Sequence, residues 1–225
     1  MFINQSMTKN VITITQDAAI YEAQDKMDNN KIRNIPVVTE ENRLIGMVTE
    51  PDIKGALPST FFPPNVSDKA GEEYPDIKIK DIMATDVVTV LPSYTIQDAL
   101  LLLQKIKAGI LPVVDEGGIL RGIVSSRDLL GAFINVLGIG QPGTLIGIVV
   151  EEKVGQLKKI VDVVTEENIS FGSVLVARYL EKNKRAVFIY LLTNTVSRVK
   201  KKLAELGFTL LEPDKWHLYG FPENG

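Results

Sequence analysis

The chain of 225 residues carries 25 Lys and Arg against 28 Asp and Glu. Its formal net charge of −3 gives no reason to expect a nucleic-acid binder. It contains no cysteine, which excludes disulfides, thiolate metal sites and cysteine nucleophiles. Because it also shows no apolar run of membrane-spanning length and no signal-peptide pattern, we expect a soluble, cytoplasmic protein.

The first predicted unit has the order β-α-β-β-α: strand 11–14, helix 19–29, strands 35–38 and 44–48, and a helix that starts at Thr49. Ile20, Ala23 and Met27 share one face of its first helix at the spacing of an amphipathic helix. Residues 55–73 follow and are rich in Pro, Gly, Ser and acidic residues, which predicts a loop. The Phe61-Phe62 pair in that loop is expected to pack onto the neighbouring units.

The same order returns at an offset of 76 residues: strand 87–90, helix 96–107, strands 111–114 and 120–124, and a helix from Ser125. Residues 46–52 (GMVTEPD) reappear as 122–128 (GIVSSRD), and Pro36-Val37-Val38 reappears as Pro112-Val113-Val114. Thr95 and Asp98 have capping-box spacing at the start of the second unit's first helix. An ungapped match of this length indicates one duplicated structural unit, so a small site in one unit is expected in both.

Residues 138–143 (GIGQPG) match the G-x-G-x-x-G pattern of dinucleotide-binding turns. A functional copy of that pattern leaves a strand and opens a helix. Here it follows a predicted helix over 128–137 and precedes a strand, so we interpret it as a hinge.

A third region has the order β-α-β-β-α-β, which is the ferredoxin-like arrangement: strand 145–151, helix 156–167, strands 173–181 and 186–192, helix 196–206, and strand 209–211. Asn194 or Thr195 is predicted to cap its second helix, and Gly207 to end that helix. The tail over 214–225 holds the only Trp and the only His, His217, with no catalytic partner fixed by the pattern.

Thr49 with Asp52, and Ser125 with Asp128, have the spacing of capping boxes, each stabilising a helix start by roughly 1 kcal/mol. A second interpretation is a ligand site. A glycine three residues before each hydroxyl would let a ligand approach the strand. The helix N-terminus suits a phosphate group, the aspartate could accept hydrogen bonds from a ribose, and the hydroxyl could donate to a phosphate oxygen.

On these motifs, residues 7–53 and 83–129 resemble two tandem CBS domains, a Bateman module. The third region resembles an ACT domain, although Val154 stands where many members have proline. The combination resembles the AcuB-type family linked to acetoin utilisation. The implied fold is α+β, with these boundaries: CBS repeat 1 over 1–57, linker loop 58–79, CBS repeat 2 over 80–137, hinge 138–143, ACT-like domain 144–213 and C-terminal tail 214–225.

The resemblance implies that AMP, ADP or ATP binds as a regulatory ligand in two clefts between the repeats. One cleft would use Gly46, Thr49, Asp52, Val87, Ala108, Gly109 and Pro112. The other would use Thr8, Val11, Ile32, Arg33, Pro36, Ser125, Arg127 and Asp128. Because Arg33 and Arg127 of the second cleft correspond to Gly109 and Pro51 in the first, we predict tighter binding at the second cleft.

The resulting hypothesis is a regulatory protein without catalytic activity, a catalytic cofactor or a metal site, forming a homodimer and modulating a metabolic-enzyme partner. It would contact neither nucleic acid nor membrane. Two alternatives stay open. The chain could be a dimeric scaffold with clefts that bind no nucleotide, or the ACT-like domain could sense an amino acid through Gly155, Gln156 and Leu157.

Overall fold

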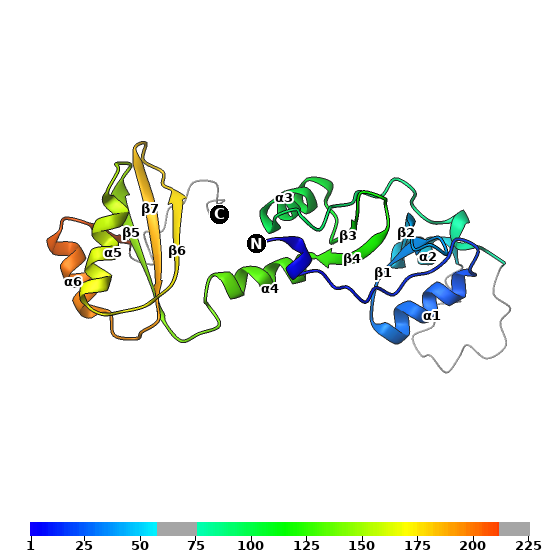
Figure 1. Cartoon of the computed structure of the whole chain (residues 1–225), viewed down its shortest axis with the longest axis horizontal. Helices are drawn as coiled ribbons and strands as arrows, with labels where there is room; N and C mark the ends of the chain where they lie inside the picture. The colour runs from blue at the N-terminus through cyan, green and yellow to red at the C-terminus, as the bar shows by residue number, and fades with distance from the viewer. Residues whose placement is uncertain (58–75, 212–225) are drawn as a thin grey trace. The chain divides into compact units, whose positions relative to one another are not determined.

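The computed structural model describes residues 1–57 and 76–211 (Figure 1). The predicted packing of Phe61-Phe62, most of the predicted linker loop, and the tail with His217 lie outside these residues. The chain divides into two compact units, Met1–Leu130 and Gly131–Gly225.

The first unit holds the two repeats, whose elements match the predicted order closely. The elements are α1 (Ile20–Asn30), β1 (Asn34–Val38), β2 (Leu44–Thr49), α2 (Glu50–Ala56), α3 (Ile96–Ile106), β3 (Ile110–Val114), β4 (Leu120–Ser125) and α4 (Ser126–Val136). Each repeat forms an antiparallel hairpin, with Asn34 opposite Thr49 in one and Ile110 opposite Ser125 in the other. Both hairpins are irregular at the same place, after Val37 and after Val113. The duplication is therefore preserved down to the strand register.

The predicted strands over 11–14 and 87–90 are each reduced to a single bridging residue, so that prediction was too long. Ile14 lies parallel to β1, with its N–H donating to Pro36 O at 3.1 Å and its C=O accepting from Val38 N at 2.9 Å. Before it, Val11 N–H donates to Lys9 O at 3.1 Å in a tight turn, and residues 11–13 form no bridge to β1 in the described structure. Val90 makes the equivalent single bridge to Val113.

The N-terminal segment of each repeat packs on the other repeat. Ile79, which lies in the stretch predicted as linker, is fully buried in the hydrophobic core formed around α1, β1 and β2. Its N–H donates to Ala18 O at 3.0 Å, and Ile20 N–H donates to Ile77 O at 2.9 Å. The hydrophobic core of the first repeat is therefore completed by a residue that belongs to the second.

The reciprocal contact fixes the start of the chain on the second repeat. Ile3 is fully buried, and its N–H donates to Tyr94 O at 2.9 Å. Ile96, the first residue of α3, donates its N–H to Met1 O at 3.1 Å. The two repeats are thus interlocked by exchanged segments.

The second unit is a four-stranded antiparallel sheet in the order β6-β7-β5-β8. Its elements are β5 (Thr144–Glu151), α5 (Gln156–Glu166), β6 (Phe171–Arg178), β7 (Lys184–Leu191), α6 (Ser197–Glu205) and β8 (Thr209–Leu211). Apolar residues of α5 and α6 pack against one sheet face and form a core that includes Ile148, Ile160 and Ile189 (Figure 1). The β-α-β-β-α-β order predicted from the sequence is therefore confirmed.

The ends of α6 test two predictions about the second unit. Gly207 ends the helix with φ of 81°, the left-handed conformation that favours glycine, as predicted. The predicted caps Asn194 and Thr195 are wrong, because the residue at the cap position is Val196 and it makes no side-chain cap. Thr195 instead donates its N–H to Thr193 Oγ1 at 3.1 Å, in a turn before the helix begins.

Candidate functional site

Two aspartates close the starts of α2 and α4 in nearly the same way. Asp52 Oδ2 accepts from Thr49 N at 2.8 Å and from Thr49 Oγ1 at 2.6 Å. Asp128 Oδ2 accepts from Ser125 N at 2.8 Å and from Ser125 Oγ at 2.7 Å. Both capping boxes predicted from the sequence are therefore formed. The other oxygen of each carboxylate, Oδ1, has no hydrogen-bond partner among residues 1–57 and 76–211 and is available to a ligand.

This geometry changes the role available to the hydroxyls. A hydroxyl has one proton to donate, and Thr49 and Ser125 both give it to an aspartate. While the box is closed, neither hydroxyl can donate to a phosphate oxygen. A phosphate at either site would depend on cationic side chains and backbone N–H groups.

The two glycines that precede these boxes are explained by contacts inside the protein. A Cβ added to Gly46 would lie 2.8 Å from Met83 Sδ and 2.9 Å from Ala84 O. A Cβ added to Gly122 would lie 2.8 Å from Met7 Sδ and equally close to Thr8 O. The missing side chains thus let the exchanged segments approach β2 and β4, which accounts for the two glycines without a ligand.

Residues of both repeats line a cavity of about 300 Å³ in the first unit. Of the eight residues predicted for the second cleft, six line it: Thr8, Val11, Ile32, Arg33, Ser125 and Asp128. Pro36 and Arg127 do not; Pro36 is buried in β1, and Arg127 is exposed on α4. The cavity combines an apolar wall with a carboxylate and a guanidinium.

Five further residues line this cavity without having been predicted from the sequence: Asn10, Ile12, Asn34, Ile110 and Ile123. The hairpin register supplies a signal for one of them, since Ile110 lies directly opposite Ser125. Ile123 lines the cavity beside Thr8, a residue of the exchanged segment that bridges to it. That contact joins residues far apart in sequence, so no local pattern predicts it.

Arg33 forms an ion pair with Glu50. Arg33 Nε lies 3.3 Å from Glu50 Oε2, and the Arg33 side chain is 82% exposed. A hydrogen bond from Lys54, with the nearby charge of Arg33 adding less, holds the pKa of Glu50 below its usual value. Arg33 therefore lines the cavity with its Nε paired to Glu50, while no described partner engages its two terminal nitrogens.

The two helix starts differ in the donors they offer. The first N–H of α2, on Glu50, donates to Arg33 O at 2.9 Å, and that of α4, on Ser126, donates to Gly109 O at 3.0 Å. The next position is Pro51 in α2, which has no N–H, and Arg127 in α4. Arg127 N–H has no hydrogen-bond partner within the described part of the chain. An anion can thus gain a backbone donor at α4 that α2 cannot supply.

Two of the seven residues predicted for the first cleft line a described cavity. Gly46 and Val87 line a smaller cavity of about 200 Å³, together with residues of the two hairpins. The other predicted residues, Thr49, Asp52, Ala108, Gly109 and Pro112, line neither this cavity nor the larger one. For the second predicted group, six of the eight residues line one cavity.

The three residues predicted to contact a ligand in the second unit, Gly155, Gln156 and Leu157, have different surroundings. Gly155 has φ of 92° at the start of α5, and this backbone conformation accounts for the glycine without a ligand. Gln156 lines a cavity of about 290 Å³ between β5, α5 and β8, which neither Gly155 nor Leu157 lines. Leu157 is 42% exposed.

Within the described ranges, no helix combines the length and apolar character needed to cross a membrane. The same residues hold no group of three or more His, Asp or Glu side chains arranged for a metal ion.

Comparison with known proteins identifies the repeats. The family model for the CBS domain matches residues 3–59 and 79–135. The chain is 33% identical over 137 residues to a CBS domain-containing protein of Dictyostelium discoideum, covering 61% of this chain and 94% of that protein. It is 32% identical over 127 residues to inosine-5'-monophosphate dehydrogenase of Methanocaldococcus jannaschii, but spans only 22% of that enzyme.

Among solved structures, the chain is similar to a protein of Vibrio cholerae assigned provisionally as the acetoin utilization protein AcuB. The TM-score is 0.52 and the identity 26%, covering 62% of this chain and 96% of that one.

Proposed function

Because the chain belongs to the CBS domain family, we propose that it is a regulatory, non-catalytic sensor that binds AMP, ADP or ATP in the cavity between Arg33 and Asp128. The observation that carries the proposal is the convergence of both repeats on that one cavity. Its volume of about 300 Å³ lies at the lower end of the range for small-molecule sites, roughly 300–1,000 Å³.

Each part of an adenosine nucleotide has a suitable partner there. The apolar side chains Val11, Ile32 and Ile110 suit a base, and the free Oδ1 of Asp128 suits a ribose hydroxyl. The phosphate would bind the guanidinium of Arg33, which lines the cavity, and would extend to the unpaired N–H of Arg127 at the start of α4, outside the cavity lining. Ser125 contributes by orienting Asp128, since its hydroxyl proton is already used.

The first cleft is proposed as the weaker site. Pro51 removes the backbone donor at the start of α2, and Gly109 stands where the second cleft has Arg33. We therefore expect the Asp128 site to bind nucleotide first and the Asp52 site to bind weakly.

Binding would regulate by favouring one arrangement of the two repeats. A ligand shifts such an equilibrium only by its difference in affinity for the two arrangements. We propose that the second unit, as an ACT-like domain, transmits the change or adds contacts between two copies, and that the partner is a metabolic enzyme. The likeness to the AcuB structure supports a role in acetoin or acetate metabolism.

Calorimetric titration of the full chain with AMP, ADP and ATP tests the proposal. Asp128→Ala should weaken binding by about tenfold or more, because it removes a charged acceptor worth roughly 1.5–3 kcal/mol. Asp52→Ala should leave the tighter site intact. Asp98→Ala is the matched control, because Thr95 and Asp98 form the same capping box at α3 without lining the cavity. No binding of any of the three nucleotides would favour a scaffold instead.

A further inference from the structure

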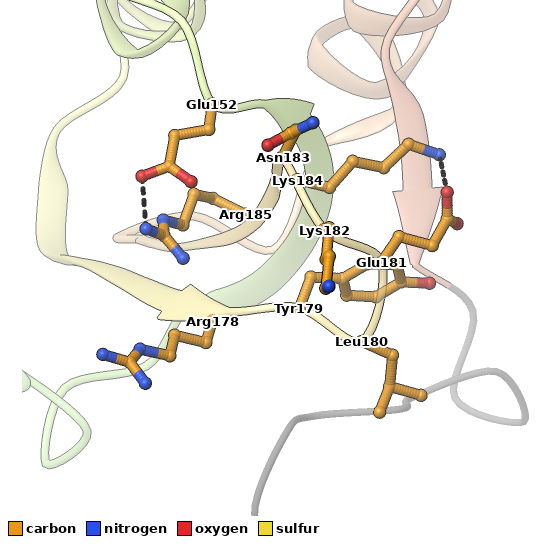
Figure 2. A pocket seen from close by; sticks show the side chains of 9 residues that line it. All are labelled: Glu152, Arg178, Tyr179, Leu180, Glu181, Lys182, Asn183, Lys184 and Arg185. Atoms are coloured by element: carbon orange, nitrogen blue, oxygen red, sulfur yellow. Dashed lines mark hydrogen bonds and ion pairs between the residues drawn. The ribbon is translucent and has the colours of Figure 1, made fainter.

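Another cavity of the second unit carries an uncompensated positive charge. It measures about 400 Å³ and lies where the β6–β7 hairpin meets the segment after β5 (Figure 2). Its lining includes four cationic side chains, Arg178, Lys182, Lys184 and Arg185, and two carboxylates, Glu152 and Glu181.

The strand register forces two of these cations together. Arg178 and Arg185 are direct partners across the β6–β7 ladder, and directly opposite side chains point to the same face of a sheet. Like charges at such positions destabilise the pair. A negative charge beside the two guanidinium groups would reduce this repulsion.

Both carboxylates of the cavity form ion pairs with cationic side chains of the same cavity. Glu152 pairs with Arg185, and Glu181 Oε2 lies 2.6 Å from Lys184 Nζ, as the dashed lines in Figure 2 mark. The hydrogen bond that Lys184 donates to Glu181 is the main cause that raises the pKa of Lys184. Arg178 and Lys182 have no hydrogen-bond or ion-pair partner in the part of the chain that the structure describes. Two positive charges therefore remain uncompensated at the cavity.

We propose that this cavity binds the phosphate monoester of a small organic molecule. A phosphate monoester carries a charge of about −1.5 to −2 at neutral pH, which matches Arg178 and Lys182 together. The planar guanidinium of Arg178 suits two phosphate oxygens at once. Tyr179 and Leu180 supply apolar surface for the organic part, and the volume suits a small molecule. The site lies outside the nucleotide cavity and does not depend on the function proposed for it.

The test is an NMR titration of the isotopically labelled full chain with glycerol 3-phosphate, with uncharged glycerol as the blank. Glycerol 3-phosphate should shift the backbone amides of residues 178–185, and glycerol should not. Arg178→Gln should weaken binding by about tenfold, the loss expected for one charged hydrogen-bonding group. Lys200→Gln, at an exposed lysine of α6 outside the cavity, is the control and should bind like the wild type.

Several outcomes would overturn the assignment. One is the absence of shifts in residues 178–185, and another is an equal loss of affinity in Arg178→Gln and Lys200→Gln, which would indicate a general charge effect. Shifts confined to residues 125–128 would assign the phosphate to the CBS repeats instead. Equal affinity for inorganic phosphate would contradict a site for an organic ester.

Discussion

Arg33 Nε lies 3.3 Å from Glu50 Oε2, and this pair has no counterpart in the second repeat, where Gly109 and Ser126 hold the same positions. Arg33 lines the larger cavity of the first unit, whereas Glu50 is the first residue of α2, beside the Thr49–Asp52 capping box. The ion pair therefore links the two predicted nucleotide sites.

Removing the carboxylate should favour a phosphate ligand. In Glu50→Gln, Arg33 no longer has a competing anion, so AMP should bind several-fold more tightly in calorimetric titration. Stability should change little, because the pair is exposed and such pairs contribute weakly. The control is Glu50→Gln in an Arg33→Gln background, where the gain should vanish. An equal gain in both backgrounds would show that Arg33 is not involved.

The two glycines under the exchanged segments should resist substitution. Gly46→Ala and Gly122→Ala each force a Cβ to within 2.9 Å of a backbone carbonyl oxygen of the other repeat. We expect each variant to lose about 1–3 kcal/mol in the free energy of unfolding, measured with urea. Gly55→Ala is the matched control, because a Cβ at this position in α2 meets nothing within 4 Å. It should be neutral or slightly stabilising, because alanine is the better helix former.

The start of α3 should be sensitive to acid. Hydrogen bonds from the side chain and backbone of Thr95, the side-chain bond first, lower the pKa of Asp98 from 3.8. The folded state therefore binds this proton less tightly than the unfolded state, and the stabilisation is complete above pH 3.8 and lost as pH falls through the folded value.

Urea unfolding of the wild type and Asp98→Asn across this range measures the effect. The difference in stability between the two should be constant at neutral pH and shrink as the pH falls below 3.8. A difference that does not change with pH would show that the carboxylate charge makes no contribution at the helix start.

The exchange of segments predicts where a mutation acts. Ile79→Ala alters a residue that precedes the second repeat, yet it leaves a cavity in the core of the first. We expect a loss of about 2–5 kcal/mol, with reduced amide-exchange protection in α1 and β1. Val88→Ala is the control, since Val88 is 40% exposed and should change stability little. Loss of protection confined to α3 and β3 would contradict the exchange.

The elements of both units could be predicted from sequence because their signals are local. Apolar spacing predicted α1, and the [Thr/Ser]-x-x-Asp pattern predicted the starts of α2 and α4, since each depends on residues within one turn. The strand over 11–14 was predicted too long, because alternation of apolar residues does not reveal that Val11 turns back onto Lys9.

The candidate site was less predictable for a related reason. Arg33 and Asp128 could be assigned to one cleft through the family resemblance, but Asn10 and Ile123 line the cavity because Thr8 bridges to Ile123. The packing role of Gly46 could not be predicted for the same reason, since Met83 reaches it from a distant segment. Local patterns predicted the capping boxes of α2 and α4, whereas the lining of the cavity depends on contacts between residues distant in sequence.

The burial of Ile3 and Ile79 has a consequence for how the chain arose. A single repeat on its own has no place to bury its N-terminal isoleucine, and two identical copies would each bury it in the other. The ancestor implied by this arrangement is a symmetric dimer of one short chain, later fused by gene duplication. Fusion allowed Arg33 and Gly109 to become different residues, so one member of the former pair could specialise while the shared core stayed unchanged.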